Sequence, residues 1–385
     1  MHFSPHSLHP PVIVSPDHKT AIEEEFSSLA RKQRPQRQVA APSTDSLEIP
    51  LTTVSLNSNF DAYIDVWFKG APATSPVQLL LDSGNSMLVV PRWEDIEALP
   101  NGSRDYKVLG TGNAPWNCPA KIVRGPIDLA TTGGDTYRLE DCVFYACTGE
   151  PPSGGSRVAN FGAGCLSPWT ANGGNRPPDI GVTMQAPLSY NSSYPYVEFN
   201  YAPVANIHGA ANTPRVARGS YLKVYKGKPS GYNMFDIIPD CEWMSLTPKA
   251  LSIGGVKTLW PGTVSSPIAM IDTGGGPVYL SDPNGYVCSN RWRDPVANPT
   301  WTSESVGCQS ISDIIAIELG DKNGSFSYNI DTSHMPPAVQ GLTLVMCKLN
   351  SYMMDQQGMN IGGISALVNC ILVDYQRCQV GFKPK

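Results

Sequence analysis

Charged side chains are scarce in this sequence, and long apolar runs are absent from it. Asp, Glu, Lys and Arg make up 16% of the 385 residues, whereas about 25% is typical of globular proteins. The formal net charge is −5, which argues against nucleic acid as a partner, because phosphate binding needs a concentrated basic surface. No apolar run approaches the ~20 residues that a membrane-spanning helix needs. We therefore expect neither nucleic acid nor a membrane as a partner.

Residues that bind metals or that mark export are also few. Most of the histidines lie at or before His18, and no Cys-x-x-Cys pair occurs, so we expect no metal site and no cofactor. The segment Gly254–Thr258 lacks the spacing of a phosphate-binding loop. The first residues lack the charged start and apolar core of a secretory signal. The chain is therefore expected in the cytoplasm if Met1 is its natural start, and outside the cell if it has been trimmed.

Glycine and proline are abundant by contrast, with 35 of each. Frequent turn residues between short apolar stretches predict an all-β protein, and a chain of 385 residues exceeds one ordinary core, which predicts two lobes. We expect an N-terminal extension over residues 1–45, an N-terminal β lobe over 46–218 and a C-terminal β lobe over 219–385. The extension is open to two interpretations: a terminal tail, or a pro-segment whose basic end covers an acidic cleft. The alternating pattern of Ala62–Phe68 predicts a half-buried strand.

One short pattern occurs twice in the chain. Leu79–Ser86 and Pro267–Gly274 each combine an apolar strand with Asp, a small hydroxyl residue and Gly. A buried carboxylate is costly unless a partner pairs with it or shares its proton. The glycine that follows lets another segment of the chain approach closely. We therefore expect the aspartates of the two stretches, Asp82 and Asp272, to meet.

A second pattern follows each aspartate at a similar distance. Gly162, in the sequence Asn-Phe-Gly, follows Asp82 at nearly the same separation along the chain as Gly362, in the sequence Asn-Ile-Gly, follows Asp272. Two motifs that recur in the same order at similar spacing indicate an internal duplication. The duplication predicts two lobes of related β topology.

The paired aspartates predict a specific chemistry. Two carboxylates held about 3 Å apart in a partly dry cleft cannot both ionise, so they share one proton. One then acts as a base on a water molecule between them, and the other donates a hydrogen bond to the substrate carbonyl. This arrangement hydrolyses an amide through acid–base chemistry, without a covalent intermediate. The hydroxyls of Ser83 and Thr273 are candidates for holding the carboxylates in place.

These motifs, taken together, resemble the pepsin-like aspartic proteases from about Ile49 to the C-terminus. The resemblance implies an all-β, bilobal fold of two related β lobes with an active-site cleft between them. It implies that Asp82 and Asp272 are catalytic and that Gly162 and Gly362 are the structural glycines past which the catalytic loops thread. Neighbouring residues would support the two loops: Ser83, Gly84, Asn85, Ser86, Thr273, Gly274 and Gly275. The short helix that follows the second hydrophobic-Gly segment would be 363–367, and the family's closing hairpin would be 373–382.

The cysteines leave alternatives open. Ten cysteines fit either a few disulfides or buried thiols. Cys142 and Cys147 either close a small loop or stay as two buried thiols. Within the resemblance, Cys308 and Cys347 bracket a strand pair and match a disulfide that is usual in the family's C-terminal lobe.

The residues after the two motif glycines differ from the family pattern. The family usually has Ser or Thr there, and the hydroxyl bonds a catalytic carboxylate. Here Asn85 and Gly275 stand at those positions. The amide of Asn85 is able to donate a hydrogen bond, whereas Gly275 has no side chain that donates. Losing a hydrogen bond to a charged group costs roughly 1.5–3 kcal/mol, so we expect a changed proton-sharing balance.

The flap, the hairpin that closes over substrate in the family, is also altered. A tyrosine usually precedes the Gly-Thr-Gly-like sequence there, whereas Leu109 precedes Gly110, Thr111 and Gly112 in this chain. Trp116 is the aromatic candidate to replace the tyrosine, and packing into a loop is the alternative role for its side chain.

Taken together, the motifs predict an aspartic-type endopeptidase that binds a peptide or protein substrate in the interlobe cleft and acts as a monomer. One alternative is an inactive homologue that binds peptide or protein in the same cleft, which Gly275 and the altered flap motivate. The other is an aspartic-protease fold reused for acid–base chemistry on a small molecule.

Overall fold

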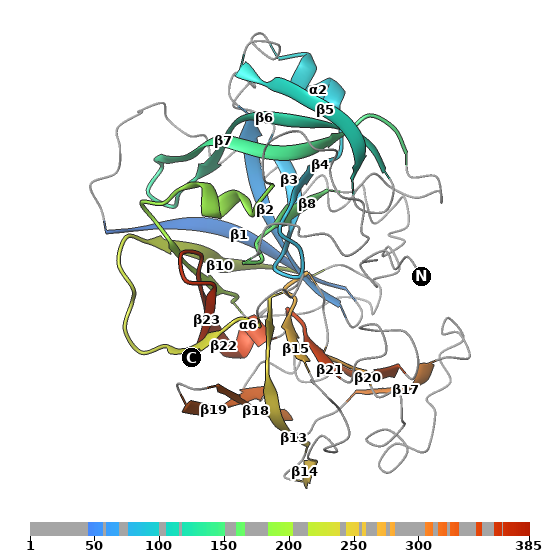
Figure 1. Ribbon diagram of the computed structural model, residues 1–385, viewed down its shortest axis with the longest axis vertical. Coiled ribbons are helices and arrows are strands. Elements are labelled where there is room, and N and C mark those ends of the chain that lie inside the picture. The colour runs from blue at the N-terminus through green and yellow to red at the C-terminus, as the bar shows by residue number, and fades with distance from the viewer. Residues whose placement is uncertain are drawn as a thin grey trace.

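The structure is a computed structural model in which strands dominate (Figure 1). It describes residues 45–56, 59–68, 76–99, 105–114, 118–150, 159–165, 184–202, 215–238, 244–253, 256–258, 268–274, 278–281, 305–310, 315–321, 324–330, 344–348, 358–363 and 365–385. The helices among these residues are short: α2 (Trp93–Glu97), the 3-10 helix η2 (Pro187–Tyr190) and α6 (Ser365–Val368). The predicted all-β class is confirmed.

Residues 1–44, and with them almost all of the predicted N-terminal extension, lie outside the described residues. None of the described helices is long and apolar enough to cross a membrane.

The largest sheet has 13 strands in the order β11-β23-β22-β9-β10-β1-β2-β3-β8-β4-β7-β6-β5. Strands from both sides of the predicted lobe boundary at 218/219 pair in it, and β10 runs across that boundary. The division into lobes stays a prediction. The strands of this sheet are β1 (Ser46–Leu56), β2 (Asn59–Phe68), β3 (Val77–Asp82), β4 (Leu88–Val90), β5 (Lys107–Ala114), β6 (Cys118–Ala130), β7 (Thr136–Cys147), β8 (Asn160–Gly162), β9 (Tyr196–Asn200), β10 (Arg215–Tyr225), β11 (Asn233–Asp236), β22 (Asn369–Asp374) and β23 (Gln379–Pro384).

Two smaller sheets contain the remaining described strands, which Figure 1 shows in the lower part of the molecule. A six-stranded sheet has the order β12-β15-β21-β16-β20-β17, and a four-stranded sheet has the order β14-β13-β18-β19. Their strands are β12 (Ser245–Leu246), β13 (Pro248–Ile253), β14 (Val256–Thr258), β15 (Ile268–Ile271), β16 (Val278–Ser281), β17 (Ser305–Ser310), β18 (Ile315–Asp321), β19 (Gly324–Ile330), β20 (Leu344–Lys348) and β21 (Gly358–Ile361).

The strands that lead to the first aspartate form as their sequence pattern predicts. In β2, Ala62, Ile64 and Val66 are fully buried and the residues between them are partly exposed. This alternation places one face of the strand in the core. In β3, Leu79 and Leu81 are fully buried while the leucine between them is half-buried. The apolar face therefore delivers Asp82 at the end of a strand that packing holds in place.

The duplication predicted from the two motifs recurs in the strand pairing. In the first half, β8 pairs parallel with β3 and antiparallel with β4. In the second half, β21 pairs parallel with β15 and antiparallel with β16. Asp82 lies opposite Gly162, and Ile271, the residue before Asp272, lies opposite Ile361. Each aspartate therefore ends a strand that runs beside its own glycine motif.

The C-terminal elements also match the prediction. Helix α6 follows the second glycine motif, and β22 and β23 pair as an antiparallel hairpin. Every residue of β22 is buried, because this strand lies between β23 and β9 in the large sheet.

Candidate active site

Each aspartate sits in a tight turn at the end of a buried strand. The backbone N–H of Gly84 donates to Oδ1 of Asp82 at 2.9 Å, and the backbone N–H of Gly274 donates to Oδ1 of Asp272 at 3.1 Å. The two carboxylates are nearly buried, with 8% and 6% of the residue surface exposed. The same local hydrogen bond therefore orients both aspartates.

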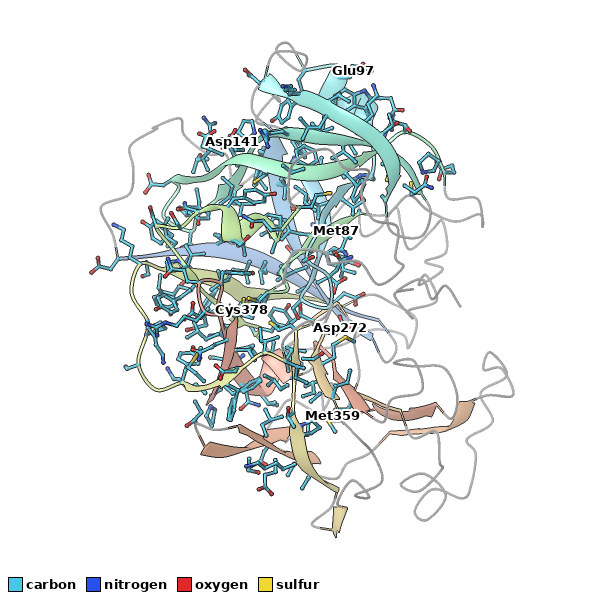
Figure 2. All side chains as sticks on the ribbon, viewed as in Figure 1. Met87, Glu97, Asp141, Asp272, Met359 and Cys378 are labelled. Atoms are coloured by element: carbon cyan, nitrogen blue, oxygen red, sulfur yellow. The ribbon has the colours of Figure 1, made fainter. Side chains whose placement is uncertain are left out.

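The two turns meet, and their glycines make the meeting possible. A Cβ atom at Gly84 would lie 2.7 Å from Cγ and Oδ1 of Asp272. A Cβ atom at Gly274 would lie 2.7 Å from Cγ of Asp82. The glycine of each loop thus packs directly against the carboxyl group of the other. Figure 2 places Asp272 near the middle of the molecule, below Met87 of the first loop.

Ser83 and Thr273 join the two loops through four hydrogen bonds, and both residues are fully buried. The N–H of Ser83 donates to Oγ1 of Thr273 at 3.0 Å, and the N–H of Thr273 donates to Oγ of Ser83 at 2.9 Å. The Ser83 hydroxyl donates to the carbonyl of Ile271 at 2.9 Å, and the Thr273 hydroxyl donates to that of Leu81 at 3.2 Å. The hydroxyls therefore hold the loops to each other, and these four bonds run to backbone groups rather than to the carboxylates.

Asn85 and Ser86 follow the first glycine. The side-chain Oδ1 of Asn85 accepts a hydrogen bond from the N–H of Met87 at 2.8 Å, which closes a local turn. Ser86 is buried, and its hydroxyl has no hydrogen-bond partner among the residues that the structure describes. Gly275, the counterpart of Asn85, lies outside the described residues.

Asn160 is a site residue to which sequence reasoning assigned no role. Its Nδ2 donates to Oδ2 of Asp82 at 2.9 Å, and only 2% of its surface is exposed. The sequence feature that pointed to it was a polar residue in the three-residue strand Asn160–Gly162, whose other two residues are apolar. The amide therefore gives the Asp82 carboxylate a side-chain hydrogen-bond donor.

The segment after Asn160 threads past the Asp82 loop. The N–H of Gly162 donates to the carbonyl of Met87 at 2.9 Å, and the N–H of Ala163 donates to that of Asp82 at 2.8 Å. A Cβ atom at Gly162 would lie 2.2 Å from the backbone N of Met87, so only glycine fits. In the second half, the N–H of Asp272 donates to the carbonyl of Ile361 at 3.1 Å, directly before Gly362.

Tyr201 is a second residue that sequence reasoning missed. It is fully buried, and its hydroxyl lies near the side chain of Thr273. Burial, with added effects of the nearby Asp82 and Asp272 charges, raises the pKa of Tyr201 above its ordinary value. The hydroxyl therefore stays protonated at ordinary pH and contributes no negative charge beside the two carboxylates.

The predicted flap is part of the β5–β6 hairpin. Leu109 marks an irregularity in the register between Val108 and Gly110, and its side chain packs on an apolar cluster that contains Met87. Gly110, Thr111 and Gly112 continue β5 with partly or largely exposed surfaces. Trp116 lies outside the described residues. The cluster connects this hairpin to the loop that carries Asp82.

The cysteines are described in part. Cys308 and Cys347 lie on the adjacent strands β17 and β20, where the register has a bulge, and their side chains lie outside the described ones. Cys142 and Cys147 are both buried and no disulfide joins them, so of the two alternatives for this pair the buried thiols hold. Among the residues that the structure describes, no cluster of His, Cys, Asp and Glu could hold a metal ion.

Comparisons with known proteins add no family assignment. No protein-family model matches the chain, and a search of curated proteins finds no match.

Proposed function

We propose that this protein is an aspartic endopeptidase with a bilobal, pepsin-like fold that hydrolyses peptide bonds of extended segments bound between the lobes. The observation that carries the proposal is the reciprocal contact of the two turns. A glycine of each turn packs against the carboxyl group of the other, at distances that leave no room for a Cβ atom. Ser83 and Thr273, which are far apart in the chain, are joined there by hydrogen bonds on buried hydroxyls.

The chemistry follows from two carboxyl groups in one nearly buried place. Removing both charges from water is costly, and like charges repel, so one shared proton is the stable state. The ionised carboxylate accepts a proton from a bound water as the water attacks the peptide carbonyl, and the protonated partner donates a hydrogen bond to the carbonyl oxygen. The C–N bond then breaks, and the proton taken from the water passes to the nitrogen of the leaving amine. The Gly84 and Gly274 N–H groups keep each carboxylate oriented, and Ser83 with Thr273 keeps the turns in contact.

Asn substitution of either aspartate tests this proposal. We expect Asp82→Asn and Asp272→Asn each to abolish cleavage, because general acid–base catalysis alone contributes about 10²–10⁴-fold to the rate. The assay is digestion of a broad peptide library by the full chain from acidic to neutral pH, read by mass spectrometry.

Asp374→Asn is the matched control. Asp374 is even more deeply buried, at 1% exposure, and its Oδ1 accepts hydrogen bonds from the N–H groups of Gln376 and Arg377 in the β22–β23 turn. This variant should keep cleavage activity if it folds. Cleavage that persists in either the Asp82 or the Asp272 variant would contradict the proposal.

A catalytically inactive peptide-binding protein is the second candidate. The observation that favours it is Asn85, whose side-chain oxygen is engaged by the N–H of Met87 at the position where the family usually has a hydroxyl. Calorimetric titration with a pepstatin-type inhibitor separates the two candidates when it is combined with the library digestion. Tight inhibitor binding without cleavage at any pH would support the binding protein.

A further inference from the structure

Asn160 contacts an aspartate from outside both catalytic turns. It lies on β8, directly opposite Leu80 and two positions before Gly162, which lies opposite Asp82. Its Nδ2 approaches Oδ2 of Asp82 to 2.9 Å, while the backbone N–H of Gly84 approaches Oδ1 of the same carboxylate to 2.9 Å. Both oxygens of Asp82 therefore accept a hydrogen bond from a fixed donor, and the plane of the carboxylate is set.

The position of Asn160 is costly unless the amide has a function. It is 2% exposed, and both Phe161, the next residue on β8, and Val89, opposite it on β4, are fully buried. Its own Oδ1 has no hydrogen-bond partner among the described residues. A buried polar group without a partner is destabilising, and an apolar side chain would avoid that cost. The bond to Asp82 is the interaction that the amide gains in return.

The duplicated half of the chain has the same residue type at the same place. Asn360 lies opposite Met270 on β21, two positions before Gly362, as Asn160 lies opposite Leu80 on β8. Asparagine is depleted in strands. Its presence at the Asn160 register position therefore needs a reason other than strand stability, and the bond to Asp82 supplies one.

We infer that Asn160 is a positioning residue that favours the ionised form of the Asp82 carboxylate and holds it in a fixed orientation. This inference rests on the proposed function for its catalytic meaning. An amide N–H does not titrate, so it donates at every working pH. A hydrogen bond from it stabilises the charged form of a carboxylate more than the neutral form.

Replacement of Asn160 by leucine tests the inference through the titration of the pair. Asn160→Leu keeps the approximate volume and removes the donor. We expect the lower of the two titration midpoints of the carboxyl pair to rise by about one to two pH units, a roughly 10- to 100-fold change in proton affinity. The readout is the ¹³C NMR signal of the carboxyl carbons in the full chain, labelled at Asp. The acidic limb of the kcat/KM profile should move in the same direction, with little change in KM.

Asn369→Leu is the matched control for this variant. Asn369 is also buried, at 3% exposure, and its Nδ2 donates to the carbonyl of Asn329 at 3.0 Å. It should lower stability without moving the carboxyl titration. The unmodified protein supplies a second measurement: the side-chain ¹H–¹⁵N signals of Asn160 should shift with the same midpoint as the carboxyl pair.

These experiments distinguish failure of this inference from failure of the proposed function. An unchanged carboxyl titration in Asn160→Leu would overturn the inference. Asn160 amide signals that stay constant across the titration would also overturn it. If the variant does not fold, the Asn160 amide signals of the unmodified protein test the inference by themselves. Neither NMR readout requires a substrate. A chain that cleaves no peptide but shows both shifts would therefore refute the proposed protease and support the hydrogen bond that favours the ionised Asp82 carboxylate.

Discussion

Gly84→Ala is the most direct test of the contact between the two turns. The added Cβ atom would lie 2.7 Å from Cγ and Oδ1 of Asp272, whereas ordinary contacts begin at 3.4 Å. Asp272 cannot turn away without losing its 3.1 Å bond from the Gly274 N–H. Gly84 is not among the positive-φ glycines of the described residues, so alanine is compatible with its backbone. The steric contact is therefore the expected cause of any loss.

The size of the effect follows from what must move. The turns would have to separate by about 0.7 Å, and overpacking of a tight site costs typically about 1–3 kcal/mol. The bonds between Ser83 and Thr273 at 2.9 and 3.0 Å would lengthen, and each is worth about 0.5–1.5 kcal/mol. The lower chain entropy of unfolded alanine returns about 0.4–1 kcal/mol. We expect a net loss of about 1–3 kcal/mol in the free energy of unfolding.

Urea denaturation followed by tryptophan fluorescence measures this loss, and peptide cleavage provides a second readout. A displacement of this size at a reacting group should lower kcat/KM by at least about tenfold. Gly227→Ala is the control, because Gly227 is exposed and a Cβ atom there would meet nothing within 4 Å. Equal unfolding free energies for the two variants would show that the two turns do not touch. That result would refute the proposed arrangement of Asp82 and Asp272.

Two further predictions concern buried hydroxyl and thiol groups. Ser83→Ala removes the hydrogen-bond partner of the Ile271 carbonyl and of the Thr273 N–H. The free energy of unfolding measured in urea should therefore fall by about 2 kcal/mol. An unchanged urea midpoint would contradict the role of Ser83 in joining the two turns. Cys378 is the exposed thiol among the described free cysteines, and its hydrogen bond with Cys165 lowers its pKa to about 7. Iodoacetamide should therefore alkylate Cys378 before the buried cysteines, at a rate that rises with pH and is half-maximal near pH 7. Peptide mass spectrometry measures the labelling of each cysteine. Equal labelling of a buried cysteine would refute this prediction.

The sequence predicted those parts of the fold and site that depend on local pattern. Alternation of apolar residues in β2, the turn glycines and the repeated Asp-hydroxyl-Gly motif each depend on a few neighbouring residues, and each has a direct physical reason. The meeting of Asp82 with Asp272 was also predictable, because a duplicated motif at similar spacing implies equivalent positions in two related halves.

Other features depended on register between distant segments, which a single sequence does not fix. Asn160 contacts Asp82 only because β8 pairs with β3 at one particular offset, with Leu80 opposite Asn160. Tyr201 reaches Thr273, which lies far from it along the chain, for the same kind of reason. The role of Asn85 was predicted from its amide donor, whereas the bond in the structure uses its oxygen, because the N–H of Met87 lies only two positions further on.

The order of strands in the large sheet sets a condition on how the chain is synthesised. Strand β9 pairs on one edge with β10 and on the other with β22, so its second edge stays open until β22 has left the ribosome. An unpaired edge of a largely buried strand invites pairing with other chains, and non-local pairing of this kind forms slowly. During translation, this edge of β9 therefore stays without its partner until Asn369–Asp374 has been made, and the hairpin β22–β23 then covers it.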